Sequence, residues 1–344
     1  MAAAVRPGPQ SLAVAILQTV FQAGVIVFVV GSLGLAGLAV TARGVLAPLK
    51  HTRFVVLTLG LGWILCPSVA YGLIRLMPVA SPYETGLLLL SLAPGAPFAP
   101  AIARAARADA AYTAAFIALT SVATVVLMPL GVAILIPGST TDPGVIARPL
   151  LWFVCLPLLT GVLIRDRFPR TADRMTTLVE GITRLSGAVL LVLMFVLYGQ
   201  GVLDTFGSFA ILTLLLFLVA VTVVTDLAGS ALPSTQRSAL TIGMCTRNLG
   251  AALAPAAVID PDPRVIVMIV IAAPATLAVG VAAARMLAGR AADRMSGPVP
   301  KSHSSSVVTV RPLATGHSEP GRDTSHDASR ARELSSARRI AHRR

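Results

Sequence analysis

Charged residues are scarce in this chain of 344 residues. Asp, Glu, Lys and Arg together make up 12% of the sequence, and 55% of the residues are hydrophobic. Soluble domains carry about 25% charged residues, and one soluble core of this length could not bury so much apolar surface. The composition therefore excludes an ordinary soluble domain and predicts an all-α polytopic protein embedded in a lipid bilayer.

Cysteine and histidine are also scarce. The three cysteines, Cys66, Cys155 and Cys245, lie in apolar runs, so we predict free buried thiols and no disulfides. Four of the five histidines follow residue 289, and His51 lies in a loop. No His/Cys cluster with metal-ligand spacing exists, so we predict no metal site and no cofactor. An integral membrane enzyme is disfavoured because the apolar segments lack histidines and paired acids.

Nine apolar segments approach or exceed the roughly 20 helical residues that cross a bilayer. Basic residues such as Arg43, Arg104 and Arg165 fall in alternate loops, whereas residues 78–83, 137–144 and 199–207 contain none. By the positive-inside rule this predicts a multi-pass cell-membrane protein with its N-terminus outside and its C-terminus in the cytoplasm. The segments are 18–41, 54–77, 86–107, 111–136, 149–165, 182–202, 207–228, 238–257 and 265–287.

The composition divides the chain into three parts. We predict an extracellular N-terminus at residues 1–17, a transmembrane transporter domain at 18–288 and a disordered basic cytoplasmic tail at 289–344. The net charge of +13 might suggest a nucleic-acid partner, but eleven of the 28 basic residues lie in this tail and most others lie in short loops. That distribution indicates membrane topology, so we predict no nucleic-acid binding.

The third segment contains three prolines in seven residues, Pro94, Pro97 and Pro100, with Gly95 between the first two. A straight helix cannot carry them without losing backbone hydrogen bonds. In lipid, such a break is tolerated only where protein or a water-filled cavity surrounds it. We therefore expect this segment to face a binding site, although a kinked structural helix is the alternative.

The eighth segment carries Thr246, Arg247 and Asn248 inside an apolar run. Counting along a helix from Arg237 places Arg247 about 15 Å into the bilayer, where a cation costs at least about 2.5 kcal/mol. It needs a partner or a cavity, unless it snorkels or sits at an interface. Two interrupted segments in matching places of two halves are typical of secondary transporters built from inverted repeats.

The two motifs resemble the bile acid:sodium symporter family over about residues 20–288. The run from Ser91 to Pro97 is similar to its Cys-Pro-Gly-Gly stretch, and the run from Arg247 to Ala254 is similar to its Gln-Asn-Ser-Gly-Leu-Ala pattern. The resemblance implies two discontinuous crossing helices in a core domain that moves against a panel domain, with substrate beside the crossing. This chain resembles the family's nine-helix type.

The resemblance also implies where sodium ligands would lie, and most are missing here. The family's Ser-Asn pair falls on Ala99 and Pro100, and its Ser/Thr positions fall on Thr113 and Ile117. Only Thr113 keeps an oxygen. The remaining positions are Gly243 or Ile242 for a glutamate, Arg247 for its partner glutamine and Gly62 for a second glutamine. A hard cation needs several oxygens and no fixed positive charge nearby.

We therefore predict a secondary transporter of a small organic anion, a bile acid-like or carboxylate compound, that is not sodium-coupled. Arg247 would occupy a cation's place and attract the anion. The alternatives are a sodium- or proton-coupled symporter and a non-transporting sensor or scaffold. The candidate substrate-binding residues are Arg247, Asn248, Thr246, Pro94, Gly95, Pro97, Pro100 and Thr113. Asp226 could carry a proton for coupling, pair with Arg247 or lie at the interface.

Overall fold

The computed structural model describes residues 9–136, 142–260 and 262–296, and all regular elements in those ranges are helical. Seven continuous stretches are long and apolar enough to cross a membrane. The chain is therefore a multi-pass membrane protein. The stretches are Ala15–Leu38, Thr52–Leu76, Ala110–Leu135, Pro143–Arg167, Pro169–Asp204, Ala210–Ala231 and Pro263–Ala291.

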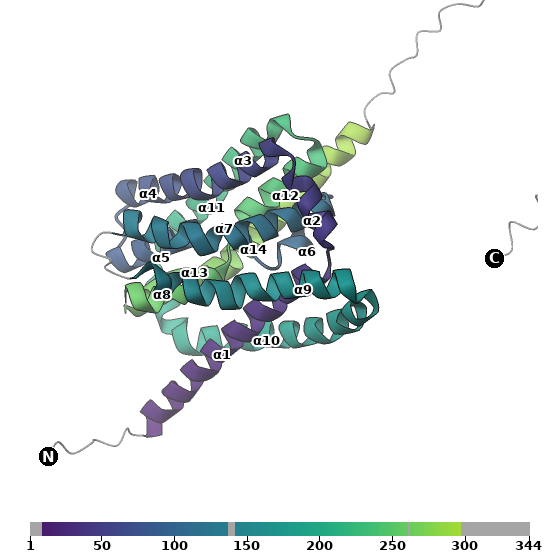
Figure 1. The fold of residues 1–344 in the computed structure, drawn as a ribbon. Helices are drawn as coiled ribbons and strands as arrows, with labels where there is room; N and C mark the ends of the chain where they lie inside the picture. Colours follow the sequence, from purple (N-terminus) through teal and green to yellow (C-terminus); the bar gives the residue numbers. More distant parts are fainter. Residues whose placement is uncertain (1–8, 137–141, 261, 297–344) are drawn as a thin grey trace, which may run out of the picture. The chain divides into compact units, whose positions relative to one another are not determined.

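The third and eighth predicted segments are not continuous. The third is split into α5 (Ser81–Ser91) and α6 (Ala99–Ala105), and the eighth into α12 (Ser234–Cys245) and α13 (Leu249–Ile259). These four are half-helices, and Figure 1 shows them among the longer helices. The other helices are α1 (Pro9–Leu38), α2 (Ala42–Leu49), α3 (Thr52–Gly60), α4 (Cys66–Leu76), α7 (Ala110–Leu135), α8 (Pro143–Leu150), α9 (Leu156–Arg167), α10 (Pro169–Asp204), α11 (Ala210–Ala228) and α14 (Pro263–Ser296).

Several predicted ends were wrong because an apolar window marks the lipid-facing part of a helix and not its full length. Helix α1 begins at Pro9 and not at residue 18, α10 begins at Pro169 and not at 182, and α14 continues to Ser296 instead of stopping at 287. The polar extensions of α10 and α14 are rich in good helix formers such as Ala, Arg and Met. The predicted tail beyond Ser296 lies outside the described residues.

Two of the long stretches contain a wide helical turn just before a proline. Residues Leu61–Leu65 precede Pro67, and Leu151–Cys155 precede Pro157. Proline has no N–H and its ring clashes with the carbonyl four residues earlier, so the preceding turn widens to the π-helical pattern. The turns keep α3 continuous with α4, and α8 continuous with α9.

Helix α1 packs against α9 and α10, and Figure 1 shows these three together. The contact with α9 is a backbone contact between glycines. A Cβ added at Gly37 would lie 2.2 Å from the carbonyl oxygen of Leu158, and one added at Gly161 would lie 2.5 Å from that of Gly34. Small residues that let two backbones meet are the usual device for joining membrane helices. We call α1, α9 and α10 the three-helix layer.

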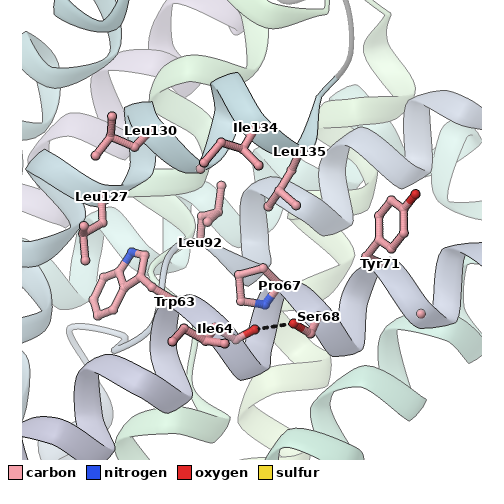
Figure 2. A pocket seen from close by; sticks show the side chains of 12 residues that line it. Trp63, Ile64, Pro67, Ser68, Tyr71, Leu92, Leu127, Leu130, Ile134 and Leu135 are labelled. Carbon is pink, nitrogen blue, oxygen red and sulfur yellow. Dashed lines mark hydrogen bonds between the residues drawn. The ribbon is translucent and has the colours of Figure 1, made fainter.

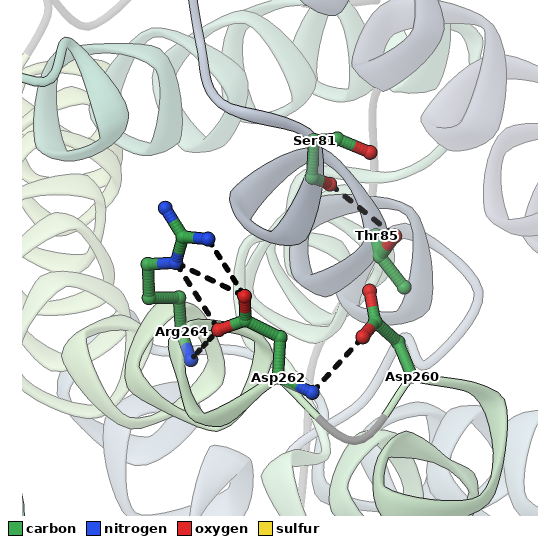
Figure 3. Close-up of polar contacts among 5 residues, drawn as sticks. All are labelled: Ser81, Thr85, Asp260, Asp262 and Arg264. Carbon is green, nitrogen blue, oxygen red and sulfur yellow. Dashed lines mark hydrogen bonds and ion pairs between the residues drawn. The ribbon is translucent and has the colours of Figure 1, made fainter.

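The start of α14 is fixed by its own side chains and by close packing on α5 (Figure 3). Arg264 donates from Nη2 to Oδ2 of Asp262 at 2.7 Å, and its backbone N–H reaches Oδ1 at 2.9 Å. These hydrogen bonds hold the pKa of the Asp262 carboxyl below its usual range. A Cβ at Gly86 of α5 would lie 2.6 Å from Cβ of Met268, so the two helices touch at this glycine.

Candidate functional site

The two breaks form hydrogen bonds with each other. The backbone N–H of Gly95 donates to the carbonyl of Thr246, and that of Asn248 donates to the carbonyl of Ala93, both at 2.9 Å. Pro94 and Arg247 thus form one antiparallel backbone pair between the breaks. Groups freed by breaking the helices are satisfied across the break, as an interruption at membrane depth requires. We call this element the crossover.

Side chains complete the crossover. The N–H of Ala96 donates to Oγ1 of Thr246 at 3.2 Å, and Oδ1 of Asn248 caps α13 by accepting from the N–H of Ala251 at 3.1 Å. Gly95 has φ +88°, and a Cβ there would lie 2.8 Å from Oγ1 of Thr120. Only glycine fits this left-handed, crowded position without strain. Thr246 and Asn248 therefore have structural partners within the crossover.

Arg247 is fully enclosed by protein, with 0% of its surface exposed. Its Nη2 lies 2.7 Å from the carbonyl oxygen of Met244 and 3.2 Å from Sγ of Cys66, and its Nη1 lies 3.5 Å from the carbonyl oxygen of Ser91. Its guanidinium carbon also lies 4.9 Å from the ring centre of Phe217. The alternative in which Arg247 snorkels to an interface is therefore wrong.

The two carbonyls around Arg247 come from the last turns of half-helices. Ser91 is the last residue of α5, and Met244 is next to the last of α12. Helix C-termini carry about half a negative charge each, so the guanidinium sits between two negative helix ends. None of the ion pairs found in residues 9–136, 142–260 and 262–296 involves Arg247. The helix ends are its counter-charge.

A cavity of about 660 Å³ lies beside the crossover, between α1 and α10 on one side and α6 and α7 on the other. Of the predicted substrate-binding residues, Pro97, Pro100 and Thr113 line it. The other five, Pro94, Gly95, Thr246, Arg247 and Asn248, are in or next to the crossover pair and do not line this cavity. Their role in binding substrate stays a prediction.

The charged groups on the cavity wall are Arg104 of α6 and the pair Glu180 and Arg184 of α10. Glu180 and Arg184 are joined by an ion pair one helical turn apart. Arg104 takes part in no ion pair within the described residues, so the wall carries a net positive charge. Most of the remaining wall is apolar, with Ser32, Thr113, Thr176 and Thr183 adding hydroxyls.

Arg104 was missed as a site residue because we interpreted it only as a topology signal. Its spacing gave a clue, since Pro100 and Ala101 precede Arg104 by four and three residues and share one face of α6, just after Pro97. All four line the cavity. The α10 residues carried no such clue because they lie N-terminal to or at the start of the predicted apolar segment at 182–202.

Of the positions where the family resemblance implies sodium ligands, Gly243 is closed off by an apolar ring, whereas Arg247 and Thr113 carry polar side chains. A Cβ at Gly243 would lie 2.5 Å from the ring of Phe116, so this ring occupies the space of a longer side chain. A Cβ at Gly62 would meet Pro94 at 3.4 Å and Met244 at 3.5 Å. The Thr113 hydroxyl donates to the backbone carbonyl of Asp109 at 2.8 Å.

Asp226 of α11 is buried and forms ion pairs with Arg237 and Arg290. The Nε of Arg237 reaches Oδ1 at 2.7 Å, and Nη1 of Arg290 reaches Oδ2 at 2.7 Å. The alternative in which Asp226 pairs with Arg247 is wrong. Its carboxylate ties α11 to α12 and α14.

A second cavity of about 540 Å³ lies between the π-helical turn before Pro67 and helix α7 (Figure 2). Its wall is almost entirely apolar, and the Ser68 hydroxyl already donates to the carbonyl of Ile64 at 2.7 Å. Leu92, at the C-cap of α5, also lines this cavity. Its side chain packs so close to Gly131 that a Cβ added there would lie 2.4 Å from Cδ2 of Leu92. This cavity presents no charge, so it offers nothing to hold a charged solute.

The sequence was compared with known proteins. Residues 25–205 match the family model described as the Sodium Bile acid symporter family. The search of curated proteins found no match. The matched region includes α5, α6, all of α10 and every residue that lines the cavity beside the crossover. It ends before α12 and α13.

Proposed function

Because the chain belongs to the sodium bile acid symporter family, we propose that it is a secondary transporter of a small organic anion and that sodium does not drive it. Its family consists of transporters and not enzymes. The observation that carries the proposal is the cavity beside the crossover, which presents Arg104 without an acidic partner among the described residues.

The size and polarity of the cavity favour an amphipathic solute. Its volume of about 660 Å³ lies within the usual range for pockets that hold drug-sized ligands. The wall combines apolar residues of α1 and α7 with a few hydroxyls and with the Arg104 guanidinium, which forms no ion pair within the described ranges. A bile acid-like or other carboxylate compound fits this pattern, with its rings or chain on the apolar wall and its acidic group at Arg104.

The crossover supports independence from sodium. Arg247 places a permanent positive charge between the ends of α5 and α12, and a second cation close by would be repelled. The ring of Phe116 fills the space next to Gly243, where the family resemblance implies a carboxylate ligand. The sequence also has no oxygen-bearing side chain at Ala99, Pro100 or Ile117.

The test is uptake into proteoliposomes that contain the full chain, with a panel of labelled bile acids and simpler carboxylates. We expect Arg104→Gln to lower uptake of the transported compound at least about tenfold, because a hydrogen-bonded charge partner is lost. Arg43→Gln removes an exposed positive charge outside the cavity and should leave uptake unchanged.

Replacing a sodium gradient by a choline gradient should not change the uptake rate. Wild-type uptake in Arg104→Gln would contradict the proposed binding mode. Uptake that requires sodium would contradict the proposed coupling and leave the binding mode standing.

A further inference from the structure

A third cavity, of about 270 Å³, lies where α6 ends, α12 begins and α14 approaches its C-terminal end. It does not belong to the cavity beside the crossover, since the two share no lining residue among those described. Three arginines line it, Arg107, Arg237 and Arg290, together with the hydroxyl residues Ser234, Thr235 and Ser238. We call it the three-arginine pocket.

The pocket carries more positive than negative charge. Asp226 is paired with both Arg237 and Arg290, and Arg107 adds a third guanidinium, so the three arginines and one carboxylate have a net charge of about +2. Arg107 forms no ion pair in the part of the chain that the structure describes. A cluster of this kind attracts an anion with one or two negative charges.

Two of the arginines are held in place by Asp226, and all three are accessible. Asp226, with 7% of its side chain exposed, orients Arg237 at 17% and Arg290 at 48% exposure. Arg107 is exposed and follows α6 in a left-handed conformation, φ 54°, the position at which helices usually place glycine. Each guanidinium therefore retains N–H groups that can reach a ligand in the pocket.

The first turn of α12 adds donors. Its N-cap is Pro233, which supplies no side-chain hydrogen bond to the free N–H groups of the turn. Three hydroxyl groups lie on the same wall. Guanidinium forks, hydroxyls and helix N–H groups together are the donors that bind phosphate oxygens.

We propose that the three-arginine pocket binds a phosphate group, carried either by an anionic phospholipid headgroup or by a small free phosphate. The basic loops around it are those we predict to face the cytoplasm, where anionic lipids and basic pockets meet. Bound phosphate would join the end of α6 to the start of α12. Close by, the N–H of Asp109, the N-cap of α7, already donates to the carbonyl of Thr235 at 3.1 Å. It would thereby tie together one half of each broken helix.

The experiment measures binding and not transport, so it is independent of the proposed function. Purified, delipidated full-length protein is examined by native mass spectrometry with phosphatidylglycerol or phosphatidylcholine, and by thermal unfolding with inorganic phosphate. The variants are Arg107→Gln and Arg290→Gln. Arg43→Gln is the matched control, because it removes one exposed charge on the same predicted face outside the pocket.

We expect the wild-type protein to retain phosphatidylglycerol in preference to phosphatidylcholine, or to be stabilised by inorganic phosphate. Binding of that ligand should be at least about tenfold weaker in Arg107→Gln and Arg290→Gln and unchanged in Arg43→Gln. Retention of the lipid alone identifies a headgroup site, and stabilisation by inorganic phosphate identifies a site for free phosphate. Failure of both ligands to bind, or equal binding by wild type and the two pocket variants, would overturn the proposal. Arg107→Lys keeps the charge and should retain part of the binding, which separates loss of the ligand from misfolding.

Discussion

Replacing Arg247 tests whether its charge holds the ends of two half-helices together. The guanidinium lies 2.7 Å from the Met244 carbonyl and 3.5 Å from the Ser91 carbonyl. A helix end with half a charge attracts a cation about 3 Å away by about 3 kcal/mol at an effective dielectric constant of about 20. The two ends together give about 5 kcal/mol, and desolvation of the guanidinium offsets several kcal/mol. We estimate a net stabilisation of about 2 kcal/mol.

The informative variant is Arg247→Met, because methionine fills much of the same space without charge. At about 2 to 4 °C per kcal/mol, its midpoint of thermal unfolding should fall by about 4 to 8 °C. Arg247→Lys keeps the charge but replaces the two-pronged guanidinium with a single ammonium group, so it should lose about half as much. Arg247→Ala should lose the most, since it also leaves a cavity.

The assay is thermal unfolding of the purified protein in detergent, with uptake into proteoliposomes measured on the same preparations. An Arg247→Met variant as stable as the wild type, with normal uptake, would refute the reasoning. The side chain would then be filling space, and the arrangement of helix ends around it would have no energetic role.

Two further substitutions test the local geometry. Gly95→Ala forces a side chain into a left-handed position that has no room for it, so it should lower the free energy of unfolding by about 1 to 3 kcal/mol. Gly72→Ala, at a helical glycine with open space around it, should leave stability unchanged or slightly higher. A smaller loss at Gly95 than at Gly72 would contradict the assignment. Asp226→Asn should destabilise the protein by about 3 kcal/mol in thermal unfolding, because it leaves Arg237 and Arg290 without their shared carboxylate. Asp226→Glu keeps the carboxylate and should lose less stability. Wild-type stability in Asp226→Asn would show that the ion pairs contribute little.

The sequence predicted the first break because proline and glycine act through the backbone, and backbone effects are local. The second break was predicted from Arg247 and Asn248 inside an apolar run. Pro94, Gly95 and Pro97 interrupt the third segment wherever the surrounding helices lie. Seven of the nine predicted segments are continuous stretches that are long and apolar enough to cross a membrane. The ends of α10 and α14 were predicted poorly, since a polar turn can continue a helix beyond the apolar run at little cost.

The partners of individual side chains could not be predicted, because they depend on which helices become neighbours. Asp226 lies 11 residues from Arg237 and 64 from Arg290, and nothing in the local sequence favours these partners over Arg247. Arg104 and Glu180 line one cavity although they are far apart in the chain. Positive charge near a membrane segment predicts topology first, so the second role of Arg104 was visible only in three dimensions.

The hydrogen bonds between Ala93 and Asn248 and between Gly95 and Thr246 have a mechanical consequence. They fasten the broken helices into one joint, just as the glycine contact at Gly37 and Gly161 fastens α1 to α9. Bending either joint would break backbone contacts. The two groups of helices can therefore move relative to each other most easily along the cavity wall between the joints. Any motion that exposes a solute first to one side and then to the other should therefore be a slide of two stiff bodies along that wall.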